Sequence, residues 1–573
     1  MDEKNYWQPG PWQRWRSRPS RRQVIQASAV LAGWWLAACA QGGSQRPSEP
    51  VATRPGEGEP RQGGQAVIFI NHPDTLNPAI SPVSTTIYNT PFFYNGLTRP
   101  ADDYQSLPDL AESWEISSDS LVYTFKLRRN VKFHDGQPFT AEDVKFTWEL
   151  ISHPENTPGR QIAGFFSQIK GAREYTAGRA PEIEGIKILD PYTIQVTLVE
   201  VYAPFLSISA GQPILPKHVW KDVPVRELGA HPASRRPVGT GPFILESWRT
   251  NDSMVLRANP EYYAGRPYLD RIISVMPGDA TTAFNLLKAG ELNVMGLYAA
   301  VPIDNYEEAA ADPRLETRPL PGLANMYVEF NFRNPLFQDL RVRKAISYAT
   351  DRKAIRENLW KGRAVFINGP IHPTFWAAKL DTTTYDNDPA QARQLLAEAG
   401  WRLGPDGILE KEGTKFRFKV SSIQTAANPY DVVLQEQWKR VGIDAQIERM
   451  DFASFWAPIY LAGRHEVAAL NLPFGLYLDP DYPLGGYFSS ALNRNKYVNP
   501  RVDELIRLAT ATLDREERKQ RYYELQETLA RDVPHLWLGV PDEIWGITRG
   551  LVIPKKPNGY LTIRTAKEWY WAR

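Results

Sequence analysis

Cysteine is almost absent from this chain of 573 residues, which contains only Cys39. A single cysteine excludes a disulfide within the chain, and it also excludes CxxC redox motifs and cysteine-based zinc sites. Hydrophobic residues make up 42% of the sequence, which is enough for a substantial core. The length predicts several domains or one large protein with several lobes.

Motifs of catalysis and metal binding are also missing. GxSxG, HExxH and Walker sequences do not occur, and the eight histidines are scattered without metal-ligand spacing. We therefore predict no cofactor and no metal site. Asp479 and Asp481 could form the carboxylate pair of a glycoside hydrolase, but Pro480 between them favours a turn. The sequence therefore predicts a protein that is not an enzyme.

The net charge of the whole sequence is only +2. Six basic and two acidic residues precede Cys39, so the remainder of the chain carries a net charge of −2. A nearly neutral body offers no electrostatic footprint for nucleic acid, and we expect no nucleic-acid partner.

Residues 1–38 are predicted to be an export signal. Basic residues come first, and the apolar stretch at 24–38 is about 15 residues long, shorter than the roughly 20 of a membrane span. SRRQVIQ (20–26) resembles a twin-arginine signal, and LAAC (36–39) resembles a lipobox. The lipobox predicts lipidation of Cys39, and a chance LAAC in an ordinary cleavage region is the alternative. Residues 39–64, rich in Gly, Ser, Pro, Gln and Glu, are a predicted flexible tether.

The stretch from Leu107 to Leu150 predicts a strand, a turn and a helix. Tyr123, Phe125 and Leu127 alternate with less apolar residues, which is typical of a strand with one buried face. The His-Asp-Gly sequence at 134–136 predicts a turn. Thr140 followed by Asp143 predicts a capping box at the start of a helix.

The same stretch carries a family resemblance. PDLAESWE (108–115) and VKFHDGQPFTAEDVKFTW (131–148) resemble the signature of the bacterial extracellular solute-binding proteins of family 5, the oligopeptide-, dipeptide- and nickel-binding group. FYNGLTR (93–99), PVGTGPFILESW (237–248) and FQDLRVRKAISYATDRKAI (337–355) resemble further family blocks. The resemblance therefore extends over nearly all of residues 65–573.

This resemblance implies an α/β fold of the two-lobed periplasmic-binding-protein kind, type II-like and of the large cluster, with an additional third domain. Residues 65–97, 240–330 and 536–573 are expected to form lobe I, 98–239 the extra domain II, and 331–535 lobe III. Two chain crossovers, near 330 and 535, are expected to act as a hinge, and closure of the lobes encloses the ligand.

Local patterns predict further elements. They are a hairpin at 186–198, a helix that ends at Gly290, and a helix that is capped by Asp388 and ends at Gly400. A further helix is predicted near 503–531 and is ended by Pro534. The strand–helix–strand order at 415–450 predicts a parallel pair of strands with a right-handed crossover.

NLPFGLYLDPDYPLGGYF (471–488) resembles the cleft-lining segment of the family, which ends in Asp-Pro-Asp. The resemblance implies that in dipeptide- and oligopeptide-binding members an aspartate three residues before this triplet pairs with the terminal amine of the peptide. Leu476 occupies that position here. A buried ammonium without a carboxylate costs roughly several kcal/mol, so this mode of amine recognition is not expected.

Aromatic residues accompany this segment, and rings suit both sugars and apolar side chains. A structural role is the alternative for each: a core position for the tryptophans and turn-making for the two aspartates. The predicted ligand-binding residues are Asn331, Trp456, Tyr477, Asp479, Asp481, Trp537 and Trp545.

The resemblance implies the extracytoplasmic substrate-binding component of an ABC importer, which captures a peptide-like solute. Because the chain has no P-loop, a membrane permease with a separate ATPase must complete the importer. Alternatives are an oligosaccharide-binding protein of the same fold, a ligand-sensing surface receptor and, more distantly, a metal-chelate binder. The expected partners are the solute, the permease with its ATPase, and the membrane through the lipid on Cys39; the chain itself is expected to be a monomer.

Overall fold

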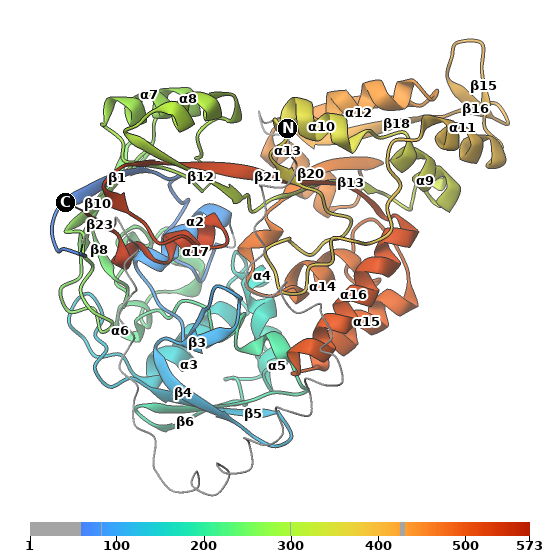
Figure 1. The fold of residues 1–573 in the computed structure, drawn as a ribbon. Helices are drawn as coiled ribbons and strands as arrows, with labels where there is room; N and C mark the ends of the chain where they lie inside the picture. Colours follow the sequence, from blue (N-terminus) through green and yellow to red (C-terminus); the bar gives the residue numbers. More distant parts are fainter. Residues whose placement is uncertain (1–58, 82, 298, 425–429, 573) are drawn as a thin grey trace, which may run out of the picture. The chain divides into compact units, whose positions relative to one another are not determined.

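The structure is a computed structural model that describes residues 59–81, 83–297, 299–424 and 430–572. Gly58–Arg573 forms one compact unit, shown in Figure 1. The predicted export signal and Cys39 lie outside the described residues. Within the described part of the chain, no helix combines the length and the apolar character that crossing a membrane requires.

The predicted strand and helix of the 107–150 stretch are confirmed. In β5 (Val122–Leu127) every second side chain is buried, beginning with Tyr123. Helix α3 (Ala141–Ser152) starts with the predicted capping box, in which the backbone N–H of Thr140 donates to the Asp143 carboxylate at 2.9 Å. These local signals place the helix start without help from the rest of the chain.

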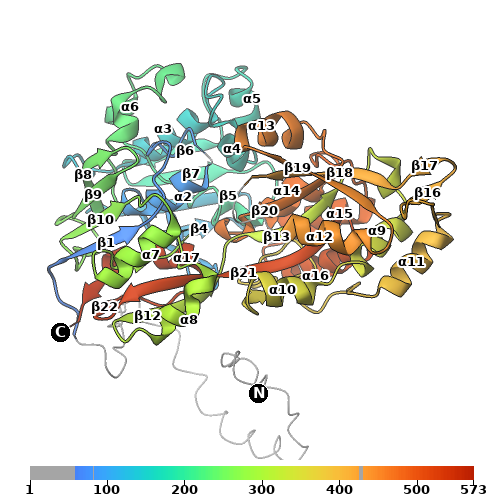
Figure 2. The same cartoon turned by 90° about the horizontal axis from the view of Figure 1, so that it is seen from above.

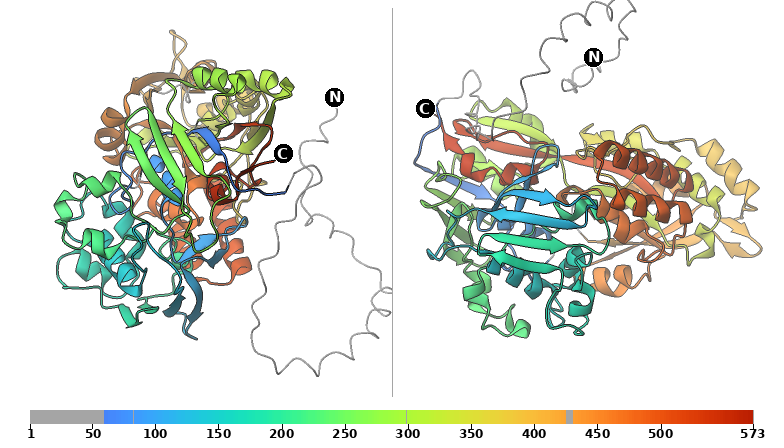
Figure 3. Two further views of the ribbon diagram at one scale, coloured as in Figure 1. Left: turned by 90° about the vertical axis from the view of Figure 1, so that its left-hand side faces the viewer. Right: turned by 90° about the horizontal axis from the view of Figure 1, so that it is seen from below.

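A small antiparallel sheet surrounds β5. Its order is β4 (Ala111–Ile116), β5, β7 (Thr193–Thr197) and β6 (Ile186–Asp190), so the predicted hairpin at 186–198 is confirmed. Figure 3 shows this sheet from below. The fully buried Trp148 of helix α3 lies with its ring 6.3 Å from that of Phe205, which in turn lies 4.7 Å from the ring of Tyr123 in β5.

The large sheet contains strands from both ends of the chain. Its order is β19 (Asp444–Met450), β18 (Arg417–Ile423), β20 (Val467–Leu472), β13 (Asn325–Phe330), β21 (His535–Thr548), β11 (Val294–Met295), β1 (Gln65–Phe69), β10 (Arg271–Val275), β9 (Ser253–Ala258) and β8 (Phe243–Arg249). Strands β18 and β19 run parallel and are joined through α12 (Tyr430–Lys439), as the strand–helix–strand order predicts.

Strand β21 connects two halves of this sheet (Figure 2). One half contains β19, β18, β20 and β13, and the other contains β11, β1, β10, β9 and β8. The first residues of β21 pair with β13, and its last residues pair with β12 (Leu315–Pro321). Helices α7 (Ala280–Ala289) and α8 (Tyr306–Ala311) lie along the second part of β21, and α10 (Arg352–Leu359) and α12 lie along the first part (Figures 1 and 2). The chain thus passes from one half to the other at 322–324 and again along β21.

The two passages lie close together, and each contains a glycine. A Cβ atom on Gly322 would lie 2.6 Å from the carbonyl oxygen of Pro541, and one on Gly539 would lie 2.9 Å from that of Val365. The strand pairing changes at these passages. Strand β12 ends at Pro321 and β13 begins at Asn325, a few residues before position 330. Strand β21 pairs with β13 up to Gly539 and with β12 from Asp542, a few residues after position 535. The lobe limits expected from the sequence remain a prediction.

The predicted helical segment near 503–531 is a pair of helices, α15 (Pro500–Ala511) and α16 (Arg515–Asp532), in agreement with the helical pair that the resemblance implies. The Asp514 side chain accepts a hydrogen bond from the N–H of Glu517 and thereby starts the second helix. The predicted caps at Asp388 and Gly290 are also present, on α11 (Pro389–Glu398) and α7 respectively.

Candidate functional site

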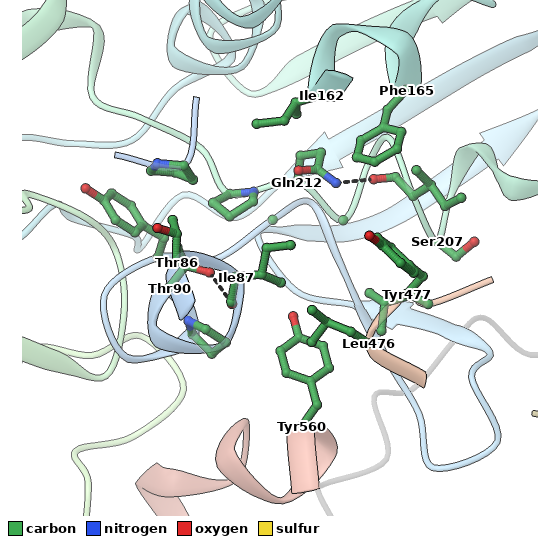
Figure 4. Close-up of a pocket in the computed structure, with 18 of the residues that line it drawn as sticks. Thr86, Ile87, Thr90, Ile162, Phe165, Ser207, Gln212, Leu476, Tyr477 and Tyr560 are labelled. Atoms are coloured by element: carbon green, nitrogen blue, oxygen red, sulfur yellow. Dashed lines mark hydrogen bonds between the residues drawn. The ribbon is translucent and has the colours of Figure 1, made fainter. Parts of the chain in front are cut away.

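A cavity of about 90 Å³ lies where four distant stretches of the chain meet. These stretches are 78–96, 162–213, 476–482 and 560–564. Figure 4 shows their side chains around a common space. The labelled lining residues are Thr86, Ile87, Thr90, Ile162, Phe165, Ser207, Gln212, Leu476, Tyr477 and Tyr560. A mainly apolar lining with a few polar groups is typical of sites for small organic ligands, although the volume of this cavity is below the roughly 300–1,000 Å³ of such sites.

The predicted cleft segment supplies one wall of this cavity. Leu476 is 2% exposed, and it packs into the same core as residues from the first hundred of the chain. The rings of Tyr477 and Tyr482 stack with their centres 3.7 Å apart, and Phe165 meets Tyr482 edge-on at 5.2 Å. The Gln161 amide also donates a hydrogen bond to the Tyr482 hydroxyl. The wall is therefore aromatic and is fixed to the 161–165 stretch.

An ion pair braces this wall from behind. The guanidinium of Arg518 in α16 donates to both carboxylate oxygens of Asp479, at 2.6 and 2.8 Å, and to the hydroxyl of Tyr522 at 2.8 Å. Burial alone lowers the pKa of Arg518, but the Asp479 carboxylate outweighs this effect and raises it. The cavity-lining hydroxyl of Ser207 also donates to Asp479, at 3.3 Å. The pair therefore connects the wall to α16 and to the opposite side of the cavity.

Asp481 begins α14 (Asp481–Phe488) next to this pair. Burial, and then the negative charge of Asp479, raise the pKa of Asp481 to about 6. The hydroxyl of Thr510 donates to its carboxylate at 2.6 Å. Neither aspartate lines the cavity among the described residues, and both act behind its wall.

Of the predicted ligand-binding residues, Tyr477 lies in the cavity wall. Asn331 is 2% exposed, and its amide donates to the backbone carbonyls of Gly463 and His465. Trp456 is half-buried and stacks on Phe452 with ring centres 5.6 Å apart.

The two other predicted tryptophans lie on β21. Trp537 is buried against Tyr327, with ring centres 4.9 Å apart. Trp545 is fully buried beneath Gly296, where a Cβ atom would lie 2.3 Å from the indole ring. The roles proposed for these residues in ligand binding remain predictions.

The sequence gives no indication that several of these residues line a cavity. Ile87, Ile162 and Tyr560 lie on the short helices α2 (Ser84–Asn89), α4 (Arg160–Ala163) and α17 (Gly559–Ile563), which no sequence pattern predicted, and Gln212 lies in a bend. Tyr94 lies within the FYNGLTR block, which the resemblance marked as a family segment without giving any of its residues a role. Only their three-dimensional proximity identifies these residues as parts of one site.

A second buried cluster of titratable side chains contains Glu329 on β13, His535 on β21 and His465 just before β20. Nε2 of His465 is 3.0 Å from one oxygen of the Glu329 carboxylate, and Nε2 of His535 is 3.3 Å from the other. Burial raises the pKa of Glu329, but the two imidazoles outweigh this effect and lower it. Within the described residues, no set of three or more His, Cys, Asp and Glu side chains is arranged to hold a metal ion.

Residues 106–495 match the model of the bacterial extracellular solute-binding proteins, family 5 middle. The sequence is 28% identical to the oligopeptide-binding protein AppA of Bacillus subtilis over 561 residues, which cover 95% of this chain and 96% of the relative. It is 30% identical to heme-binding protein A of Haemophilus influenzae, over 76% of this chain and 79% of the relative.

Solved structures of similar proteins have the same fold. AppA of Bacillus subtilis, in complex with a nonapeptide, superposes with a TM-score of 0.75 at 26% identity and covers 90% of this chain and 100% of its own. NikZ of Campylobacter jejuni, in complex with Ni(L-His), gives 0.74 at 26% identity and covers 89% of this chain and 99% of its own. These matches confirm the expected two-lobed α/β fold.

Proposed function

This chain belongs to the bacterial extracellular solute-binding proteins of family 5, and on that premise we propose that it captures a peptide-like solute in the cavity of Figure 4. The single observation that carries the proposal is the composition of the cavity wall. Stretches more than 400 residues apart in sequence supply apolar and aromatic side chains to one space. Such a wall suits apolar side chains of a peptide, and relatives named as oligopeptide- and dipeptide-binding proteins support this choice.

The protein acts by binding and release. Closure around the solute takes place at the two passages between the halves of the large sheet, and the solute then moves to a membrane permease with a separate ATPase. The chain works as a monomer and carries out no reaction on the solute.

We also infer that lipid on Cys39 holds the protein at the extracytoplasmic face of the membrane. The only cysteine of the chain stands at the end of LAAC, after a basic and then an apolar stretch. Mass spectrometry of the N-terminal peptide should show a diacylglyceryl-sized addition on Cys39, and Cys39→Ala should release the protein from the membrane. Unmodified Cys39 in protein taken from membranes would contradict the anchor.

A thermal-shift screen tests the proposed function. The intact protein is heated with peptides, oligosaccharides, heme and nickel chelates, since relatives are named for heme and nickel as well as for peptides. A ligand at about 100 times its dissociation constant adds roughly 2.7 kcal/mol of stability. A shift with peptides alone supports the proposal. A shift with another class and none with peptides contradicts it.

We further infer that the site does not select for a free amino terminus. Leu476 is buried in the cavity wall, and no carboxylate lines the cavity among the described residues. A free-amine peptide and its N-acetylated form should therefore bind alike, as measured by calorimetric titration. A strong preference for the free amine would show that a carboxylate does reach the ligand.

A further inference from the structure

Arg564 stands where the cavity of Figure 4 meets a second, roomier one. The second cavity has a volume of about 410 Å³, and both cavities are lined by Pro91, Tyr94 and Arg564. The first is mainly apolar, and Arg564 is the one charged side chain among its described lining residues. The second is lined by several charged side chains from 99–109 and 556–568. A ligand that leaves the apolar cavity on this side therefore passes Arg564.

Most of the charges in the second cavity are already paired. Lys556 contacts the Asp102 carboxylate at 3.0 Å, and Lys567 lies 3.9 Å from that of Glu568. Arg564, in contrast, forms no ion pair with a carboxylate of the described residues. Its guanidinium donates to the Tyr560 hydroxyl at 3.1 Å and lies 5.6 Å from the centre of that ring. A half-buried guanidinium with several unused donors is a ready partner for an oxyanion.

Tyr94, which also lines both cavities, carries a second unused donor. Its side chain is 4% exposed, and its hydroxyl has no hydrogen-bond partner among the described residues. Burial keeps its pKa well above the ordinary value, so the group stays an O–H donor. A buried hydroxyl left without a partner costs free energy, which a ligand oxygen recovers when it accepts the hydrogen bond.

Asp109 is the remaining carboxylate in the second cavity, and it does not neutralise Arg564 directly. The Asn95 amide donates to it at 3.1 Å, and the hydroxyl of Tyr263 donates to it as well. Burial raises its pKa in spite of these donors and of the more distant charges of Arg99 and Arg564. Asp109 is therefore held by neutral groups, and the positive charge at the junction of the two cavities remains available.

From this geometry we propose that Arg564 and Tyr94 bind a carboxylate of the solute. The solute places an apolar part between Ile87 and Leu476 and its anionic end at the junction, directed toward the larger cavity. This inference rests on the proposed function and gives it a substrate class: peptides, or other apolar acids, with a free carboxylate. A buried charge-assisted hydrogen bond is strong enough to set the orientation of such a ligand.

The test compares peptide acids with peptide amides. The intact protein is mixed with equimolar libraries of tripeptides and nonapeptides, each made as the free acid and as the C-terminal amide, and native mass spectrometry identifies the bound species. The wild-type protein should bind acids at least about tenfold more tightly than amides, which is the effect of one hydrogen bond to a charged group.

Two variants and a matched control locate the effect. Arg564→Gln and Tyr94→Phe should each reduce the preference for acids, because the affinity for acids falls far more than the affinity for amides. Thermal unfolding of each variant shows whether it is folded. Arg440→Gln removes an exposed arginine that lines neither cavity, and it should keep the full preference.

The possible outcomes separate the two proposals. Equal binding of acids and amides by the wild-type protein overturns this inference and leaves the proposed function intact. A preference that survives both Arg564→Gln and Tyr94→Phe also overturns it, because another group then holds the carboxylate. Binding of neither library, together with a thermal shift for a ligand that is not a peptide, overturns the proposed function and this inference with it.

Discussion

Two of the buried clusters of charged or titratable side chains differ in both chemistry and position. Asp479 is paired with Arg518, whose charge is permanent, and this pair lies directly behind the wall of the cavity. Glu329 contacts the imidazoles of His465 and His535, and this group lies around β13 and β21, away from the cavity lining. The first group therefore positions the wall segment, whereas the lowered pKa of Glu329 makes the contribution of the second group to stability depend on pH.

Among the variants of the two groups, Arg518→Met should have the largest effect on stability. This substitution leaves the Asp479 carboxylate buried without its partner, which costs about 3–5 kcal/mol of stability. Because Asp479 is part of the wall segment, peptide binding should weaken as well. Urea unfolding and calorimetric titration measure the two effects. The double variant Asp479→Leu/Arg518→Met is the control, since replacing both charges should recover most of the stability.

Glu329→Gln should reduce stability by about 2 kcal/mol at neutral pH, because it removes a buried carboxylate that contacts two imidazoles. The pKa of Glu329 is lowered in the fold, so its stabilisation is complete above the unfolded pKa and is lost as the pH falls through the folded value. Unfolding at several pH values should therefore show the difference from wild type shrinking below about pH 4. Peptide affinity at neutral pH should not change, and a clear loss would contradict the separation of the two groups.

Tyr477→Ala should weaken peptide binding about tenfold, near 1.4 kcal/mol, because it removes a ring that lines the cavity and stacks on Tyr482. Stability should change less than with Arg518→Met. Trp456→Ala is a matched control, since Trp456 is an aromatic residue of the same half that does not line the cavity. An equal loss of affinity in both variants would mean that the ligand site extends to Trp456.

Asp481→Asn should have the smallest effect and the opposite sign. The pKa of Asp481 is raised to about 6, so its favourable contribution is present at low pH and is lost as the pH rises from about 4 to 6. The variant should therefore be about 1 kcal/mol more stable than wild type at pH 7.5, after allowance for partial exposure, and equal to it near pH 3.5. Thermal unfolding at the two pH values measures the difference, and a variant that is less stable at pH 7.5 would contradict this account.

Local structure could be predicted well from the sequence, because local patterns determine it. The alternation at Tyr123 and Phe125, the capping box at Thr140 and the cap at Asp388 all depend on residues within a few positions of one another. The parallel pair β18 and β19 followed from the order of strand, helix and strand.

The composition of the candidate site could not be predicted in the same way. Arg518 and Asp479 are 39 residues apart, and Tyr94 and Arg564 come from nearly opposite ends of the chain. Neither pairing leaves a periodic signal. The resemblance pointed to the segment 471–488, and the structure places Tyr477 of that segment in the cavity wall but Asp479 and Asp481 behind it.

The most direct test of the account is a crystal structure of the protein with the peptide that raises its melting temperature most. The account predicts electron density for the peptide between Leu476, Tyr477 and Tyr560, with the Asp479–Arg518 pair intact behind the wall. Peptide density against Trp537 or Trp456, with the cavity of Figure 4 occupied only by water, would contradict it.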